Sequence, residues 1–130
     1  MNEHLWNELC ECLKWHNKPG KTSIDTLNRL FVEQRSKCVR CNTVNHVILT
    51  KSNSGAAKEN WTTRQLTERL IPTMRHDRKT PKCEHGPIVV VSLPDHYHII
   101  DGSNRVNKWI SANVNGLHEV LVVSYAPESM

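Results

Sequence analysis

The sequence has no apolar run long enough to cross a membrane. Charged residues, 23% of the 130-residue chain, interrupt every apolar stretch well short of the roughly 20 residues that a spanning helix needs. Residues 1–16 are charged and amphipathic, and they lack the apolar segment of a secretory signal peptide. We therefore expect a cytoplasmic protein without a membrane partner.

Aromatic residues are also scarce, and the cysteines do not form an even set. The five cysteines are odd in number, and without a secretory signal they do not indicate a disulfide framework. Aromatic residues make up only 5% of the chain, but apolar residues make up 38%, which is enough for a globular core. The net charge of +4 is a mild basic bias that suits an anionic ligand or a nucleic acid and is diagnostic of neither.

The apolar pattern predicts an α+β fold, in which a small mixed β-sheet with helices follows an N-terminal helical hairpin. In residues 1–37, helical spacing of apolar residues predicts a helix over 3–16 and a second one from Thr22 to about Arg35. We expect residues 38–130 to form a separate α+β domain. Its predicted elements are a strand at 46–51, a flexible loop at 52–60, a helix at 61–71, strands at 87–93 and 96–101, a helix at 102–114 and a strand at 118–125.

The order of these elements also predicts how two strands pair. A chain that runs through a helix before it returns to the sheet favours parallel pairing of the strands on either side of that helix. We therefore predict that strand 96–101 lies parallel to strand 118–125.

A polar pentapeptide, Asp101-Gly102-Ser103-Asn104-Arg105, stands where strand 96–101 gives way to helix 102–114. A helix start exposes backbone N–H groups and the positive end of the helix dipole, and Gly102 would let a ligand approach the backbone. Ser103 and Asn104 can add hydrogen bonds, Arg105 can bind two phosphate oxygens, and Asp101 can bind a metal, accept a proton or cap the helix. The same residues also suit an ordinary turn followed by a helix cap.

Residues 87–123, PIVVVSLPDHYHIIDGSNRVNKWISANVNGLHEVLVV, resemble the core of the ParB/sulfiredoxin superfamily. That family carries a strand hairpin ending in a G-x-x-R box that opens a helix, and Gly102 and Arg105 match the box. The order of elements extends the resemblance over about residues 46–125. It implies that the box holds a phosphate ligand, such as a nucleotide triphosphate with Mg²⁺.

The residues in and next to the box indicate which branch of the family the chain resembles most. The Asp101-Gly102 pair is most similar to the kinase and DNA-modification branch of the family. Ser103 stands where sulfiredoxins have their redox cysteine, which argues against sulfinic-acid reduction. Asn104 replaces the His or Arg of other members, which argues against ordinary nucleotide hydrolysis.

A zinc site is a further candidate. Cys38 and Cys41 have the spacing of half a zinc site, and Cys83 and His85, or His46, could complete it. The alternative is a loop that contains reduced cysteines.

Two histidines and two arginines could act beside the box. His96 and His98 share one face of strand 96–101, where they could serve as a general base or bind a metal, or simply form an exposed polar face. Arg75 and Arg78 belong to residues 73–85, a basic connection that could fold over the box and add to a phosphate site. The same connection could instead be a solvated loop or contact nucleic acid.

Two functional hypotheses result. In the first, the box binds a nucleotide, and Asp101 with His96 or His98 supports phosphoryl transfer or phosphodiester cleavage, as in a nucleotide-dependent phosphotransferase or a nuclease. In the second, the chain is a non-catalytic module of phage, plasmid or defence biology. The box and the basic connection then contact DNA or RNA, and the N-terminal helices bind a protein partner.

Overall fold

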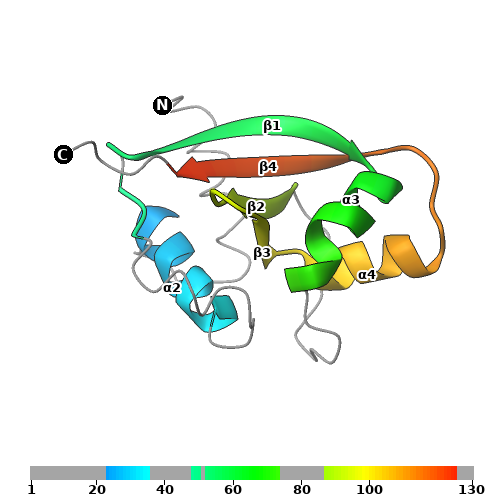
Figure 1. The fold of residues 1–130 in the computed structure, drawn as a ribbon, viewed down its shortest axis with the longest axis horizontal. Helices are drawn as coiled ribbons and strands as arrows, with labels where there is room; N and C mark the ends of the chain where they lie inside the picture. Colours follow the sequence, from blue (N-terminus) through cyan, green and yellow to red (C-terminus); the bar gives the residue numbers. More distant parts are fainter. Residues whose placement is uncertain (1–22, 36–47, 51, 74–86, 126–130) are drawn as a thin grey trace.

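A mixed β-sheet with helices against it forms the framework of the protein. The structure, a computed structural model, describes residues 23–35, 48–50, 52–73 and 87–125. The described elements are α2 (Ser23–Arg35), β1 (Ser54–Thr62), α3 (Thr63–Leu70), the 3-10 helix η2 (Ile71–Thr73), β2 (Ile88–Ser92), β3 (Tyr97–Asp101), α4 (Ser103–Ser111) and β4 (Leu117–Tyr125) (Figure 1). The predicted α+β class, a small mixed sheet with helices, is confirmed.

The sheet has four strands in the order β1-β4-β2-β3. β1 pairs antiparallel with β4, and β2 pairs antiparallel with β3, so the two short strands form a hairpin. β2 and β4 are parallel neighbours, with Val90 opposite Val122. The prediction that strand 96–101 is the parallel partner of 118–125 is therefore wrong, because β2 lies between β3 and β4.

The apolar character of β2 explains its central place. Ile88, Val89, Val90 and Val91 are all 0% exposed, so both faces of this strand are covered. A strand that is apolar on both faces is stable only inside a sheet that is packed on both sides. The more polar β3 instead takes the edge position.

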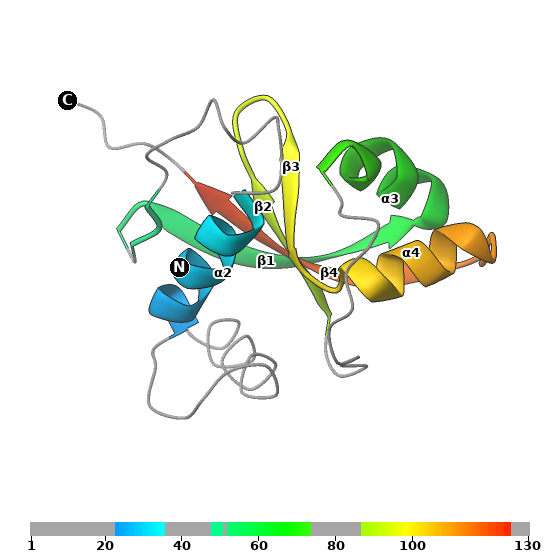
Figure 2. The same cartoon turned by 90° about the horizontal axis from the view of Figure 1, so that it is seen from below.

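Two hydrophobic clusters cover the two faces. The first contains Leu27 and Phe31 of α2, which pack against Val89, Val91 and other odd-numbered residues of β2 and β4. The second contains buried side chains of α3 and α4, packed against even-numbered residues of the same two strands. Figures 1 and 2 show the β2–β3 hairpin between α2 on one side and α3 with α4 on the other.

β1 is the largest departure from the sequence-based expectation. Its sequence, SGAAKENWT, has low β-propensity, and residues 52–60 were expected to form a flexible loop. The structure instead pairs all of Ser54–Thr62 with β4, and an ion pair of 2.9 Å joins Lys58 to Glu119 across the two strands. Pairing with a long neighbouring strand overrides the local preference, so the loop prediction is wrong.

The strand predicted at 46–51 is not seen in its described part, because residues 48–50 belong to no helix or strand. Leu49 is nevertheless buried, at 1% exposure, in the cluster beside α2. The Asn28 side chain donates to the Leu49 carbonyl (3.1 Å) and accepts from its amide (3.0 Å). The backbone of Leu49 thus bonds to a side chain of α2 and not to a neighbouring strand, as the prediction of a strand required.

The helical hairpin predicted for residues 1–37 is described only in its second half. Helix α2 confirms the predicted helix from Thr22 to about Arg35, whereas residues 1–22 lie outside the described residues. No helix in the described part of the chain is long and apolar enough to cross a membrane.

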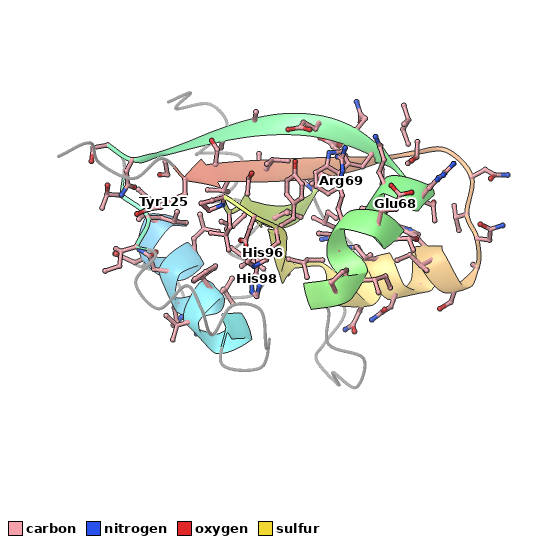
Figure 3. All side chains as sticks on the ribbon, in the orientation of Figure 1. Glu68, Arg69, His96, His98 and Tyr125 are labelled. Atoms are coloured by element: carbon pink, nitrogen blue, oxygen red, sulfur yellow. The ribbon has the colours of Figure 1, made fainter. Side chains whose placement is uncertain are left out.

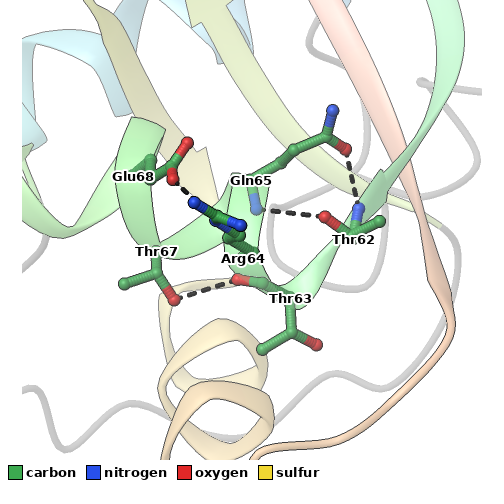
Figure 4. Close-up of polar contacts among 6 residues, drawn as sticks. All are labelled: Thr62, Thr63, Arg64, Gln65, Thr67 and Glu68. Carbon is green, nitrogen blue, oxygen red and sulfur yellow. Dashed lines mark hydrogen bonds and ion pairs between the residues drawn. The ribbon is translucent and has the colours of Figure 1, made fainter.

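A capping box fixes the start of α3 (Figure 4). The Thr62 hydroxyl accepts from the Gln65 amide at 3.1 Å, and the Gln65 side chain accepts from the Thr62 amide at 2.8 Å. Both bonds satisfy N–H groups that the first turn of a helix leaves without partners. Leu66 and Leu70 are buried, but Trp61 is part of β1 rather than of the helix predicted at 61–71.

We predict that Thr62→Ala lowers the free energy of unfolding by about 1 kcal/mol, because it removes the cap of α3. Thr67→Ala is the matched control, since Thr67 is an exposed threonine whose hydroxyl only donates back to the Thr63 carbonyl at 2.9 Å. Urea unfolding of both variants measures the difference. Equal loss of stability in the two variants would contradict the assigned role of the cap.

Candidate functional site

The junction between β3 and α4 contains the predicted box. Gly102 is the N-cap of α4 and has φ of 102°, in the left-handed region that favours glycine. No side chain among the described residues caps this helix start. The chain therefore turns directly from the strand into the helix, and the first amides of α4 are not covered by a capping side chain.

Close packing against β2 gives Gly102 a second reason to be glycine. A Cβ atom at this position would lie 2.5 Å from Cγ2 and 2.9 Å from Cβ of Ile88. Any other residue would thus need both an unfavourable backbone conformation and a displacement of the buried start of β2. This contact fixes where α4 begins relative to the sheet.

Arg105 folds back over the same turn. Its Nη2 atom lies 3.5 Å from the Pro87 carbonyl oxygen, at the long limit of a hydrogen bond, and 3.3 Å from the position of a Cβ at Gly102. The guanidinium group and the glycine of the G-x-x-R box are therefore neighbours in space. A positive side chain and the positive end of a helix lie together at this point.

Ser103 is the first residue of α4 and is only 6% exposed. Its hydroxyl oxygen is buried and makes no hydrogen bond within the part of the chain that the structure describes. Asp101 and Asn104 on either side are partly exposed. The box thus combines amide, hydroxyl and guanidinium donors with one carboxylate.

His98 lies on the face of β3 that packs against α2. It is 0% exposed, and its ring meets Phe31 of α2 edge to face, with ring centroids 5.1 Å apart. Asp101 lies three residues further along, opposite Val89 of β2 and beyond a shift of register between Val89 and Val90. The 0% exposure of His98 leaves no surface of its ring for a substrate.

Burial lowers the pKa of His98 to about 4, and the neighbouring charge of His96 adds to this effect. His98 is thus neutral near pH 7 and a weak base, whereas a general base works best with a pKa near the working pH. Its place in the core beside Phe31 is explained by packing.

His96 precedes β3, and Figure 3 shows it beside His98. Its Nδ1 lies 2.6 Å from Oδ1 of Asp95, and its side chain is only 3% exposed. It also lines a hollow of about 470 Å³ at the turn between β2 and β3. The sequence analysis paired His96 with the box, but the structure places it at the opposite end of β3.

A second buried histidine, His118, ties α3 to β4. Its ring stacks on Trp109 at 4.2 Å, and its Nε2 lies 2.8 Å from the Thr63 hydroxyl. That hydroxyl donates to the Val114 carbonyl, so Nε2 must carry the hydrogen and donate to Thr63. Burial lowers the pKa of His118, which favours this neutral form. The sequence analysis did not single out this cluster.

Several predicted site residues lie outside the described residues. These are Cys38, Cys41, Cys83 and His85 of the zinc proposal, with His46, and Arg75 and Arg78 of the basic connection. Among the described residues, no three histidine, cysteine or acidic side chains are grouped so that they could hold a metal ion. The zinc site therefore stays a prediction.

Comparison of the chain with protein-family models, with curated proteins and with solved structures finds no match in any of the three. The resemblance of residues 87–123 to the ParB/sulfiredoxin superfamily accordingly remains a prediction.

We predict that His98 makes folding sensitive to acid. Its pKa is about 4 in the folded protein and near 6.5 in the unfolded chain, so its contribution is complete above pH 6.5 and is lost as the pH falls toward 4. The shift corresponds to roughly 3 kcal/mol of unfolding free energy over this range. His98→Leu should remove that part of the acid sensitivity.

Chemical unfolding of the natural chain and of His98→Leu between pH 4 and pH 7 measures this effect. Ile100→Val, a change at the next residue on the same face of β3, is the control, because it lowers stability without altering a titratable group. If the stability of His98→Leu falls with acid as steeply as that of the control, the buried histidine is not the cause.

Proposed function

We propose that the start of α4 binds the phosphate group of a nucleotide triphosphate with Mg²⁺. The observation that carries the proposal is the position of the Arg105 guanidinium, 3.3 Å from where a Cβ at Gly102 would stand. This places a cation that can bind two phosphate oxygens beside the amides of a helix start that no described side chain caps. The buried Ser103 hydroxyl adds a donor that has no hydrogen bond among the described residues.

A phosphate suits this group of donors for two reasons. The N-terminal end of a helix favours negative charge, and the planar guanidinium group matches two oxygens of one phosphate. The bond of 3.5 Å from Arg105 to the Pro87 carbonyl holds the guanidinium group at this turn.

Among the candidate catalytic residues, Asp101 is the one adjacent to the helix start. A carboxylate at this point would be a suitable oxygen ligand for Mg²⁺ that is bound with the phosphates. His98 faces α2 and has a low pKa, and His96 lies at the other end of β3, so neither is assigned a catalytic role here. The proposed reaction class is phosphoryl transfer or phosphodiester cleavage, with the box stabilising charge on the phosphoryl group.

We predict that ATP, CTP or GTP with Mg²⁺ raises the melting temperature of the natural chain and that Arg105→Gln weakens this binding by about 10-fold or more. The loss of one charge-assisted hydrogen bond costs about 1.5–3 kcal/mol, which corresponds to a change of that size. Thermal shift and equilibrium dialysis of each nucleotide measure the effect.

Lys108→Gln is the matched control, because Lys108 is an exposed cation in the last turn of the same helix. It should bind nucleotides as the natural chain does. No response to any nucleotide, or equal affinity for Arg105→Gln and the control, would contradict the proposal. Salt-dependent binding of unrelated DNAs without any nucleotide response would favour the alternative hypothesis of a nucleic-acid-binding module.

A further inference from the structure

Arg69 of α3 lies against two aromatic rings that also contact each other. Its guanidinium carbon lies 4.6 Å from the ring centroid of Trp61 and 5.6 Å from that of Tyr97. The two rings also meet each other edge to face at 5.0 Å, so β1, α3 and β3 together fix the position of the guanidinium group. Such cation–π contacts orient an arginine without using its N–H groups.

The N–H groups of Arg69 are available to a ligand. Within the part of the chain that the structure describes, no hydrogen bond or ion pair engages this side chain. The nearby carboxylates already have partners, since Glu68 pairs with Arg64 at 3.0 Å and Asp95 with His96 at 2.6 Å. Arg69 is thus an oriented cation that forms no ion pair with a described carboxylate.

Arg69 lines the hollow of about 470 Å³ at the β2–β3 turn. This volume lies within the roughly 300–1,000 Å³ of ordinary small-molecule sites. Its apolar lining is contributed by Pro72, Leu93, Pro94 and the Tyr97 ring, and its polar lining by Glu68, Ser92, Asp95 and His96 besides Arg69. Figure 3 shows Arg69 on the side of α3 that is turned toward the sheet. The hollow therefore offers one fixed cation beside an apolar wall.

We propose that this hollow binds a small organic carboxylate, with the carboxylate on Arg69 and an apolar body against the prolines and Tyr97. The planar guanidinium group matches a carboxylate, which it can bind through two N–H groups at once. The site is separate from the box, because Tyr97 and Asp101 stand at opposite ends of β3, roughly 13 Å apart at strand spacing.

Titration of the ¹⁵N-labelled protein with benzoate tests the proposal. We expect saturable shifts of the Arg69 side-chain and Trp61 indole N–H signals, with a Kd of about 1 mM or tighter. Benzamide, which has the same shape without the charge, should bind at least about 10-fold more weakly, a difference of about 1.4 kcal/mol. Acetate, which lacks the apolar body, should also bind more weakly than benzoate.

Four variants separate binding at this hollow from general effects on the protein. Arg69→Met should abolish benzoate binding, Glu68→Gln should strengthen it by removing a negative charge at the rim, and Arg29→Met, an exposed arginine of α2, should leave it unchanged. Arg69→Lys covers the case in which Arg69→Met does not fold, and it should bind more weakly because it lacks the planar group. Absence of saturable shifts, equal binding of benzamide, or natural affinity in Arg69→Lys would overturn the proposal.

Discussion

Burial of β2 on both of its faces is the constraint on which the rest of the structure depends. Because Ile88–Val91 expose no surface, the sheet must be covered on both sides, by α2 on one and by α3 and α4 on the other. Because β2 occupies the interior position, β3 lies at the edge of the sheet, and Gly102, which follows β3, packs against Ile88. The start of α4, and with it Arg105, is thus positioned by the central strand rather than by contacts of its own turn.

The parts of the fold that could be predicted are those that the local sequence determines. The apolar run of β2, the alternation of β3 and the helical spacing in α3 and α4 all produced elements in the expected places. β1 could not be predicted, because its polar and small residues form a strand only when β4 lies beside them. The parallel partner of β4 was also predicted wrongly. Burial of both faces of β2 places β2, and not β3, beside β4.

Only part of the candidate site could be predicted from the sequence. Gly102 and Arg105 are recognisable from their spacing, and the structure brings them together at one helix start. Spacing did not reveal that His98 belongs to the core beside Phe31, because alternation gives two faces without saying which is buried. Arg69 was missed for another reason, since its ring partners come from two strands that are distant from each other in sequence.

Interstrand nuclear Overhauser effects test the central constraint most directly. If β2 lies between β3 and β4, backbone protons of Val90 should show contacts to Val122 in the parallel pattern and to Ile99 in the antiparallel pattern. Contacts from the backbone of Ile99 to Val122, with none from Val90 to Val122, would place β3 beside β4. That result would contradict the central position of β2 and the placement of the α4 start that follows from it.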